Sequence, residues 1–304
     1  MIDHGPEISD LLVDYDPETL ARRPVRKQEV LDRLARRSAP LRVARALGAK
    51  DGILDDAEVD GILVRSHLEL QRLHEEFRVG ALVRSLLVPL LNVVRGANGA
   101  SSIRVVDIGC GLGFIARWLA KHGALGDDVE LVGADYNRAL VDVAGRLAAE
   151  ESLPVRFVAA NAFRLDPPAH VYLSTGVVHH FRGDDLARLF AEHERTGAVA
   201  FLHLDIRPSA IAPLGSWVFH QARMREPLAK HDGYWSAVRA HDAATLLAAI
   251  RRGAPAFACS SVDAYPGIHA LVRIFHGFVG VRARHRAALQ AAYAPLGRRV
   301  RSER

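Results

Sequence analysis

Residues 105–113 read Val-Val-Asp-Ile-Gly-Cys-Gly-Leu-Gly, and this stretch decides the fold. An apolar run ends in Asp107, and glycines stand at positions 109, 111 and 113. Glycines at this spacing let a strand turn sharply and let the backbone approach a ligand closely. From Phe114 onward the apolar residues recur at helical spacing, so the turn ends at a helix N-terminus with free N–H groups. The stretch predicts a nucleotide-type site at the end of a first β-strand.

The positions of the glycines and of the acid distinguish between cofactors. The dinucleotide fingerprint has its third glycine one position later, where Phe114 stands. A carboxylate at Asp107 would repel a pyrophosphate and attract an ammonium or sulfonium group. The pattern Asp107-x-Gly109-x-Gly111-x-Gly113 resembles motif I of the class I S-adenosylmethionine-dependent methyltransferases.

Three further expected strands carry the same resemblance. Leu131 to Asp135 is an apolar run that ends in an acid, where both ribose hydroxyls can donate hydrogen bonds. Val155 to Ala159 leads into Asn161-Ala162-Phe163, similar to the family segment that meets the adenine. Val171 to Ser174 leads into Thr175-Gly-Val-Val-His-His-Phe181, which resembles the fourth motif of small-molecule members. The resemblance covers roughly residues 100–280, with the strands in the expected order.

The resemblance implies an α/β fold: a doubly wound, seven-stranded Rossmann-like sheet with an antiparallel edge strand, preceded by a helical N-terminal region. We expect residues 1–98 to be that helical region, which covers the substrate or supports a dimer. Residues 99–280 would form the S-adenosylmethionine-binding domain, and residues 281–304 a basic C-terminal tail. Residues 207–240 contain two of the three tryptophans and are expected to be a long loop that forms a substrate lid. The alternative is that the aromatic side chains of this insertion pack on the N-terminal helices.

The resemblance also assigns cofactor contacts. The backbone of Gly109 and Gly111 would lie near the methionine part, and Asp107 would help to hold its amino group. Asp135 would bind the ribose, and Tyr136 could stack on the adenine. Asn161 stands where the family more commonly has aspartate, but its side-chain oxygen can still accept a hydrogen bond. The full expected set is Asp107, Gly109, Cys110, Gly111, Gly113, Asp135, Tyr136, Asn161, Ala162 and Thr175.

Methyl transfer from a sulfonium is an in-line displacement, so the protein mainly aligns donor and acceptor. A base is needed only where the acceptor must lose a proton. His179 and His180 follow the fourth expected strand, and histidine is a common general base, so either can act as that base, with His180 favoured. The alternative is that one ring is buried for structural reasons and the other lines the pocket. Asp205 is expected to support a histidine, and no metal is expected.

Composition sets broader limits. The chain has 304 residues, 49% hydrophobic and 25% charged, which is typical of a globular protein. We see no apolar run long enough to span a bilayer and no signal peptide, and the chain has two cysteines, so a reducing, cytoplasmic location is expected. Cys110 is expected to line the cofactor site rather than to act as a nucleophile.

The functional prediction is methyl transfer to a small molecule, O-methylation before C- or N-methylation. Ser174-Thr-Gly-Val177 replaces the Asn/Asp-Pro-Pro-aromatic turn of enzymes that methylate exocyclic amines. The net charge of +5 leaves open an RNA methyltransferase that grips its substrate with the N-terminal region and the tail. A non-catalytic binding protein and a dehydrogenase are further alternatives. The apolar stretch 80–94 is a possible homodimer seam.

Overall fold

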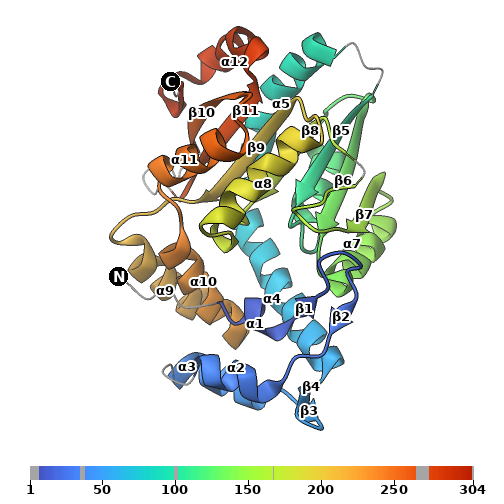
Figure 1. Cartoon of the computed structure of the whole chain (residues 1–304), viewed down its shortest axis with the longest axis vertical. Coiled ribbons are helices and arrows are strands. Elements are labelled where there is room, and N and C mark those ends of the chain that lie inside the picture. Colours follow the sequence, from blue (N-terminus) through green and yellow to red (C-terminus); the bar gives the residue numbers. More distant parts are fainter. Residues whose placement is uncertain (1–6, 35–37, 99–101, 167, 265–273, 303–304) are drawn as a thin grey trace. The chain divides into compact units, whose positions relative to one another are not determined.

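The computed structural model describes residues 7–34, 38–98, 102–166, 168–264 and 274–302. The chain divides into two compact units (Figure 1). Unit 1 contains residues 1–73 and 208–239, and unit 2 contains residues 74–207 and 240–304. This division differs from the ranges expected from the sequence in two places. Residues 74–98 belong with the sheet, and most of the 207–240 insertion belongs with the N-terminal helices.

The centre of unit 2 is a sheet with the strand order β12-β10-β11-β9-β8-β5-β6-β7. Strands β5 to β9 pair in parallel, while β11 pairs antiparallel with β9 and β10 pairs antiparallel with β11. The expected doubly wound sheet with an antiparallel edge is confirmed. The short strand β12 adds an eighth strand beyond the seven expected. The strands are β5 (Ile103–Ile108), β6 (Val129–Asp135), β7 (Val155–Ala159), β8 (Val171–Thr175), β9 (Ala200–Ile206), β10 (Phe257–Ala264), β11 (Phe275–Arg282) and β12 (Val300–Ser302).

Helices cover both faces of this sheet. One face packs against α5 (Val79–Asn98), α6 (Phe114–His122) and α12 (Arg286–Tyr293). The other packs against α8 (Asp184–Arg195) and α11 (Ala243–Gly253), which lie in front of the strands in Figure 1. Helix α7 (Arg138–Glu150) runs along β6 and β7. Two of these helices begin at side-chain caps: the side chain of Asn137 accepts hydrogen bonds from the first turn of α7, and Asp242 accepts one from the Thr245 N–H at the start of α11.

Helix α5 is the most apolar helix of the chain. Its residues 79–97 are long and apolar enough to cross a membrane by length and composition, contrary to the sequence-based expectation. However, 56% of this window is buried, and Leu87, Leu90 and Leu91 lie in the core against the sheet. Buried core helices meet the same criterion, so this is a weak indication of a membrane span. The packing also accounts for the apolar composition without a second copy of the chain.

The C-terminal residues, expected to be a basic tail, include a helix that packs into unit 2. Leu289 and Tyr293 of α12 are buried in the same core as α5, and the Tyr293 hydroxyl donates a 2.5 Å hydrogen bond to the carbonyl of Leu86. The two apolar side chains lie four residues apart, on one face of the helix, which explains why this part of the arginine-rich segment is ordered.

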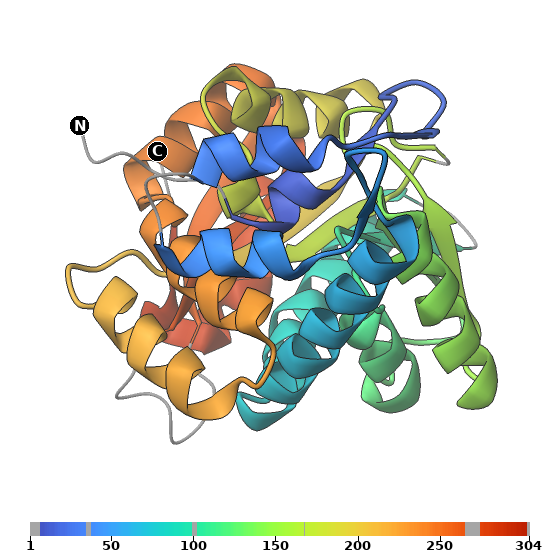
Figure 2. The ribbon, with the colours of Figure 1, turned by 90° about the horizontal axis from the view of Figure 1, so that it is seen from below.

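Unit 1 is mainly helical (Figure 2). Its elements are α1 (Ser9–Leu12), β1 (Asp14–Tyr15), β2 (Arg22–Arg23), α2 (Lys27–Leu34), α3 (Ser38–Ala46), β3 (Ala49–Lys50), β4 (Ile53–Leu54), α4 (Asp56–Glu76, which continues into unit 2), α9 (Ala212–Arg223) and α10 (Pro227–Arg239). The 207–240 insertion is therefore a pair of packed helices rather than the expected loop.

Two contacts explain why the 207–240 insertion is helical. The buried carboxylate of Glu69 on α4 accepts hydrogen bonds from the N–H groups of Arg225 and Glu226 at the start of α10. Gly233 on α10 lets the His220 ring of α9 approach its backbone.

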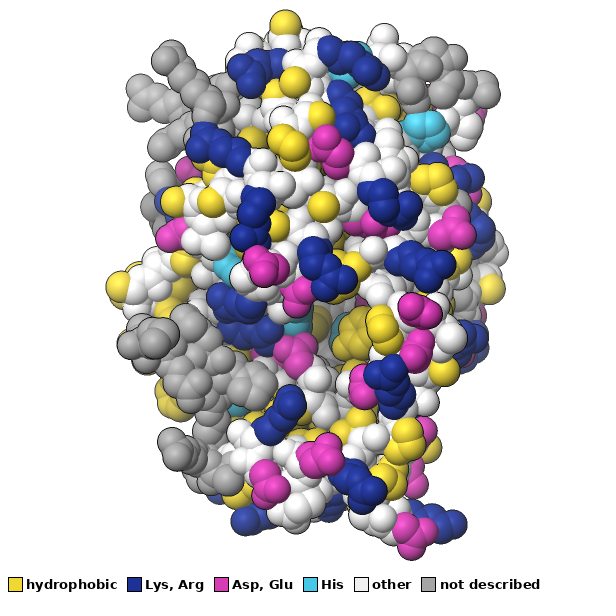
Figure 3. All heavy atoms as spheres, viewed as in Figure 1, with side chains coloured by type: hydrophobic (Ala, Val, Ile, Leu, Met, Phe, Trp, Pro, Cys, Tyr) yellow, Lys and Arg dark blue, Asp and Glu magenta, His cyan; other side chains and the backbone are white. Residues whose placement is uncertain are grey.

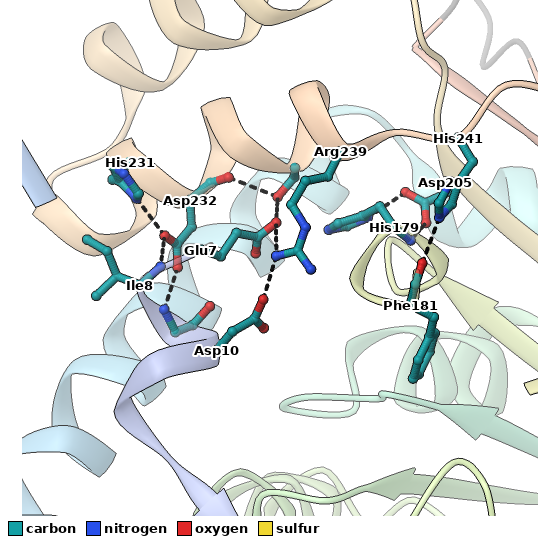
Figure 4. A network of polar contacts seen from close by, with 12 residues as sticks. Glu7, Ile8, Asp10, His179, Phe181, Asp205, His231, Asp232, Arg239 and His241 are labelled. Carbon is teal, nitrogen blue, oxygen red and sulfur yellow. Dashed lines mark hydrogen bonds and ion pairs between the residues drawn. The ribbon is translucent and has the colours of Figure 1, made fainter. Parts of the chain in front are cut away.

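The N-terminal segment is fixed to α10 by polar contacts (Figure 4). The Asp232 carboxylate accepts hydrogen bonds from the N–H groups of Ile8 (2.8 Å) and Ser9 (3.0 Å). Arg239 forms ion pairs with Asp10 and Glu7. These contacts join residues more than 220 positions apart, so they tie both chain segments of unit 1 together.

Candidate cofactor and catalytic site

The glycine loop joins β5 to α6 in a conformation that side chains rarely adopt. Gly109 and Gly113 have φ values of +66° and +69°. A Cβ atom at Gly109 would lie 2.7 Å from the Val177 side chain, and one at Gly113 would collide with the Phe157 ring. The loop is therefore a close-packed cradle of bare backbone, as a nucleotide site at this place requires.

Asp135, at the end of β6, holds this loop in place. One carboxylate oxygen accepts a 2.9 Å hydrogen bond from the Gly111 N–H, and the other accepts one of 2.9 Å from the Asn137 N–H. The acid expected to bind the ribose thus also connects the glycine loop to the start of α7. Each carboxylate oxygen can accept a further hydrogen bond, so these contacts leave room for hydroxyl donors.

Asp107 is buried beside this arrangement, only 4% exposed. Burial, with the nearby charge of Asp135, raises the pKa of Asp107 to about 8. In the free protein this side chain is therefore largely protonated at neutral pH, and an arriving positive charge would favour its ionised form. Burial and the same two carboxylates raise the pKa of the Cys110 thiol well above its ordinary value. This thiol stays protonated, which argues against nucleophilic catalysis by Cys110.

The remaining predicted contacts follow β6, β7 and β8. Tyr136 is 44% exposed, so its ring is accessible beside Asp135. The side-chain oxygen of Asn161 accepts a 2.9 Å hydrogen bond from the Phe163 N–H, which shapes the turn that contains Ala162. The buried Thr175 hydroxyl has no hydrogen-bond partner among the residues that the structure describes. A buried orphan hydroxyl is costly unless a ligand satisfies it.

These observations fit S-adenosylmethionine. The glycine cradle, the two acids and the orphan hydroxyl of Thr175 lie at or just beyond the carboxyl ends of parallel strands. This is where open α/β sheets bind their ligands. Asp107, Asp135 and Cys110 are brought close enough for their charges to interact.

His179 and Asp205 form a buried pair at the ends of β8 and β9. The His179 Nδ1 lies 2.7 Å from one carboxylate oxygen of Asp205, and the His179 backbone N–H donates to the other at 2.8 Å (Figure 4). Burial alone would raise the pKa of Asp205, but the His179 ring and the backbone N–H donors lower it to about 2. Asp205 therefore remains a carboxylate and orients the imidazole. His180 is half-buried, and its ring centroid lies 4.4 Å from that of His179.

A second set of buried histidines was not predicted as a unit. The Nε2 atoms of His193 and His203 lie 2.8 Å apart, and His203 Nδ1 lies 2.7 Å from the Ser174 hydroxyl. Burial lowers the pKa of His203 to about 3 and that of His193 well below its ordinary value. Both rings are neutral and stack among aromatic side chains such as Tyr172. No sequence signal links His193 on α8 to strand β9, because this contact depends on helix–sheet packing.

Comparisons with known proteins agree with this geometry. Residues 105–197 match the family model described as a methyltransferase domain. Ubiquinone biosynthesis O-methyltransferase from Mesorhizobium japonicum is 34% identical over 95 residues, which are 30% of this chain and 36% of that protein. The chain thus matches about a third of the length of this curated relative.

Solved structures of methyltransferases align with this chain at low sequence identity. The plantazolicin methyltransferase BamL, in complex with a triazolic desmethylPZN analog and SAH, aligns with a TM-score of 0.52 and 12% identity. The alignment covers 73% of this chain and 96% of that protein. The magnesium protoporphyrin IX methyltransferase from Synechocystis PCC 6803, with bound SAH, aligns at a TM-score of 0.45 and 17% identity, over 84% and 99% of the two chains. The family match covers the glycine loop and the strands that carry it, so residues 105–197 of this chain match a methyltransferase domain.

Proposed function

We propose that this protein transfers the methyl group of S-adenosylmethionine to a small molecule, at a hydroxyl oxygen that loses its proton during the reaction. The observation that carries the proposal is the His179–Asp205 pair, which stands at the same edge of the sheet as the glycine loop. When bound, the cofactor supplies an electrophilic methyl group. The curated relative from Mesorhizobium japonicum is an O-methyltransferase, which supports oxygen as the acceptor atom.

Different residues of the chain bind the cofactor and remove the proton from the acceptor. The backbone of the glycine loop, with Asp107, holds the amino acid part of the cofactor, and Asp135 holds the ribose. The Asp205 carboxylate accepts a hydrogen bond from the His179 Nδ1–H, and this tautomer leaves the lone pair on Nε2 as the base. His180 remains a second candidate for this role, because its ring lies against that of His179. A base within reach of the acceptor hydroxyl contributes roughly 10²- to 10⁴-fold to such reactions.

Several observations favour a small molecule over RNA. Arg22 pairs with Asp56 (3.0 Å) and Asp60 (2.7 Å), and Arg23 pairs with Asp16 (2.6 Å). The Lys27 ammonium donates hydrogen bonds to backbone carbonyls. On the face in Figure 3, Lys and Arg side chains are scattered among acids rather than gathered into one basic stripe. RNA binding through phosphates needs basic groups that are free to meet them.

Calorimetric titration with S-adenosylhomocysteine tests the cofactor assignment. We expect saturable binding by the wild-type protein and none by Gly111→Arg, whose side chain would fill the loop (Gly111 has a φ of +53°). Circular dichroism of the variant controls for folding. If the wild-type protein does not bind this ligand, the proposal is wrong.

Two further measurements address the acceptor. When phenols, catechols and amines are screened with radiolabelled S-adenosylmethionine, we expect labelled O-methyl products from phenols or catechols and no labelled product from amines. Titration with ribosomal RNA provides the contrast, and tight binding that weakens steeply with salt would favour the RNA alternative.

A further inference from the structure

Unit 1 contains a large open cavity formed by α3, α4, α9 and α10. Its volume is about 1650 Å³, and every residue that lines it belongs to unit 1. Small-molecule sites usually measure roughly 300–1,000 Å³. The cavity can therefore hold a molecule of several rings together with solvent.

One wall of the cavity is apolar and accessible. Trp217 on α9 is 49% exposed, and Leu214, one turn earlier, is 65% exposed. Tyr234 and Trp235 on α10 also line the cavity, with their rings edge to face and their centroids 5.2 Å apart. Exposed aromatic side chains that converge on one cavity are typical of sites for flat apolar ligands.

The charges around the cavity are unbalanced. Glu226 is paired with Arg65 at 2.8 Å, and the Glu58 carboxylate accepts a hydrogen bond from the Gly48 N–H. Within the described ranges of the chain, no carboxylate lies within ion-pair distance of Arg42 or Lys230, although both line the cavity. The acids are thus engaged with the protein, while two cations remain available to a ligand.

We propose that this cavity binds an extended aromatic molecule that carries an anionic group, with the rings against Trp217 and Trp235 and the anion near Arg42 and Lys230. The class follows from the combination of aromatic wall and free cations: an uncharged aromatic compound would leave both cations without a partner, and a small anion would leave the apolar wall in water.

Two fluorescent dyes test the class directly in the full-length protein. 1-Anilinonaphthalene-8-sulfonate carries an anion, whereas N-phenyl-1-naphthylamine has nearly the same rings without it. We expect the sulfonate to bind more tightly by about tenfold, which corresponds to one good charge-assisted contact. Equal affinities for the two dyes would overturn the proposal.

Variants separate the contributions of charge and rings. Lys230→Gln and Arg42→Gln should each weaken binding of the sulfonate about three- to tenfold and leave the neutral dye unchanged. Arg45→Gln, on the same helix as Arg42 but not lining the cavity, is the matched control and should change neither affinity. Trp217→Ala should weaken both dyes, with circular dichroism reporting on its folding. A Lys230→Gln and Arg42→Gln double variant that binds the sulfonate like the wild type would refute the charge assignment.

Two further experiments identify the kind of molecule that binds in the cavity. Aromatic acids should displace the sulfonate dye from the cavity, and displacement by none of them would overturn the proposal. Binding to phosphatidylglycerol vesicles that depends on Leu214 and Trp217 would instead indicate a membrane surface and overturn the proposal. The failure of this proposal can be distinguished from the failure of the proposed function. The proposed function fails if the protein does not bind S-adenosylhomocysteine, whereas the dye measurements need no cofactor.

Discussion

Asp205 contacts His179 twice, through the ring Nδ1 at 2.7 Å and through the backbone N–H at 2.8 Å. The Ile206 N–H donates a further 2.7 Å hydrogen bond to the same carboxylate. These bonds fix both the position of the histidine backbone and the tautomer of its ring. The carboxylate therefore determines which ring nitrogen of His179 carries the proton. Asp205 acts through His179, so it is a positioning residue.

The first prediction concerns this pair. His179→Gln should lower kcat about 10²- to 10⁴-fold. Asp205→Asn should lower it about tenfold or more and move the acidic limb of the pH–rate profile to lower pH, because a neighbouring negative charge favours the imidazolium. A purely structural role would lower activity without moving that limb. His180→Gln is the matched comparison, and a larger loss there than in His179→Gln would assign the base to His180.

The second prediction concerns proton release. Because the pKa of Asp107 is about 8 in the free protein, binding of a ligand whose ammonium group lies beside this side chain should expel its proton at neutral pH. Titrations with S-adenosylhomocysteine in buffers of different ionisation enthalpy should detect release of up to one proton. Asp107→Asn should abolish this release and weaken binding. Equal proton release by the variant and the wild type would show that the proton comes from a group other than Asp107.

Ionisation of the buried Asp107 should lower the free energy of unfolding of the free protein. The folded-state pKa of about 8 lies above the unfolded value of 3.8, so the associated stability is present below about pH 4 and lost as the pH rises through 8. At pH 8 we expect Asp107→Asn to unfold a few degrees higher than the wild type in thermal melts. The difference should shrink toward pH 4. A variant that is less stable at every pH would contradict the prediction.

The third prediction compares two glycines. Gly113→Ala should destabilise the protein by at least about 2 kcal/mol and weaken cofactor binding, because its φ of +69° and the Phe157 ring both exclude a side chain. Gly145→Ala on α7, where the structure leaves open space, should instead stabilise it by about 0.5–1 kcal/mol. Urea unfolding of both variants measures the contrast. Similar effects of the two substitutions would show that the loop conformation is not restrictive.

The fourth prediction concerns acid sensitivity. His193 and His203 are neutral when folded, with pKa values well below the unfolded value of 6.5. Their contribution to the free energy of unfolding is therefore present above pH 6.5 and is lost as the pH falls toward about 3. Between pH 7 and pH 5 we expect each histidine to lower the free energy of unfolding by about 2 kcal/mol. His193→Gln should reduce this loss. The exposed His122→Gln is the control, and it should follow the wild-type curve.

Much of the sheet could be predicted because its signals are local. The Asp107-x-Gly109-x-Gly111-x-Gly113 pattern depends on backbone geometry within a few residues, so it can be recognised from the sequence alone. Apolar runs also identified strands β5 to β8 in their order along the chain. The insertion between β9 and α11 was misjudged as a loop because its helices depend on distant partners, such as the Glu69 carboxylate at the start of α10.

The amino-acid sequence by itself determined the glycine loop, the acids at the strand ends and the type of fold, since neighbouring residues restrict each other's backbone. Only the tertiary structure decided which histidine meets Asp205, that His193 and His203 pair, and that α5 is covered by the sheet. It also brought residues 208–239 together with the N-terminal helices around one cavity. These relationships join residues far apart in the chain, and they arise from the burial of apolar faces and the pairing of buried polar groups, which no local pattern specifies.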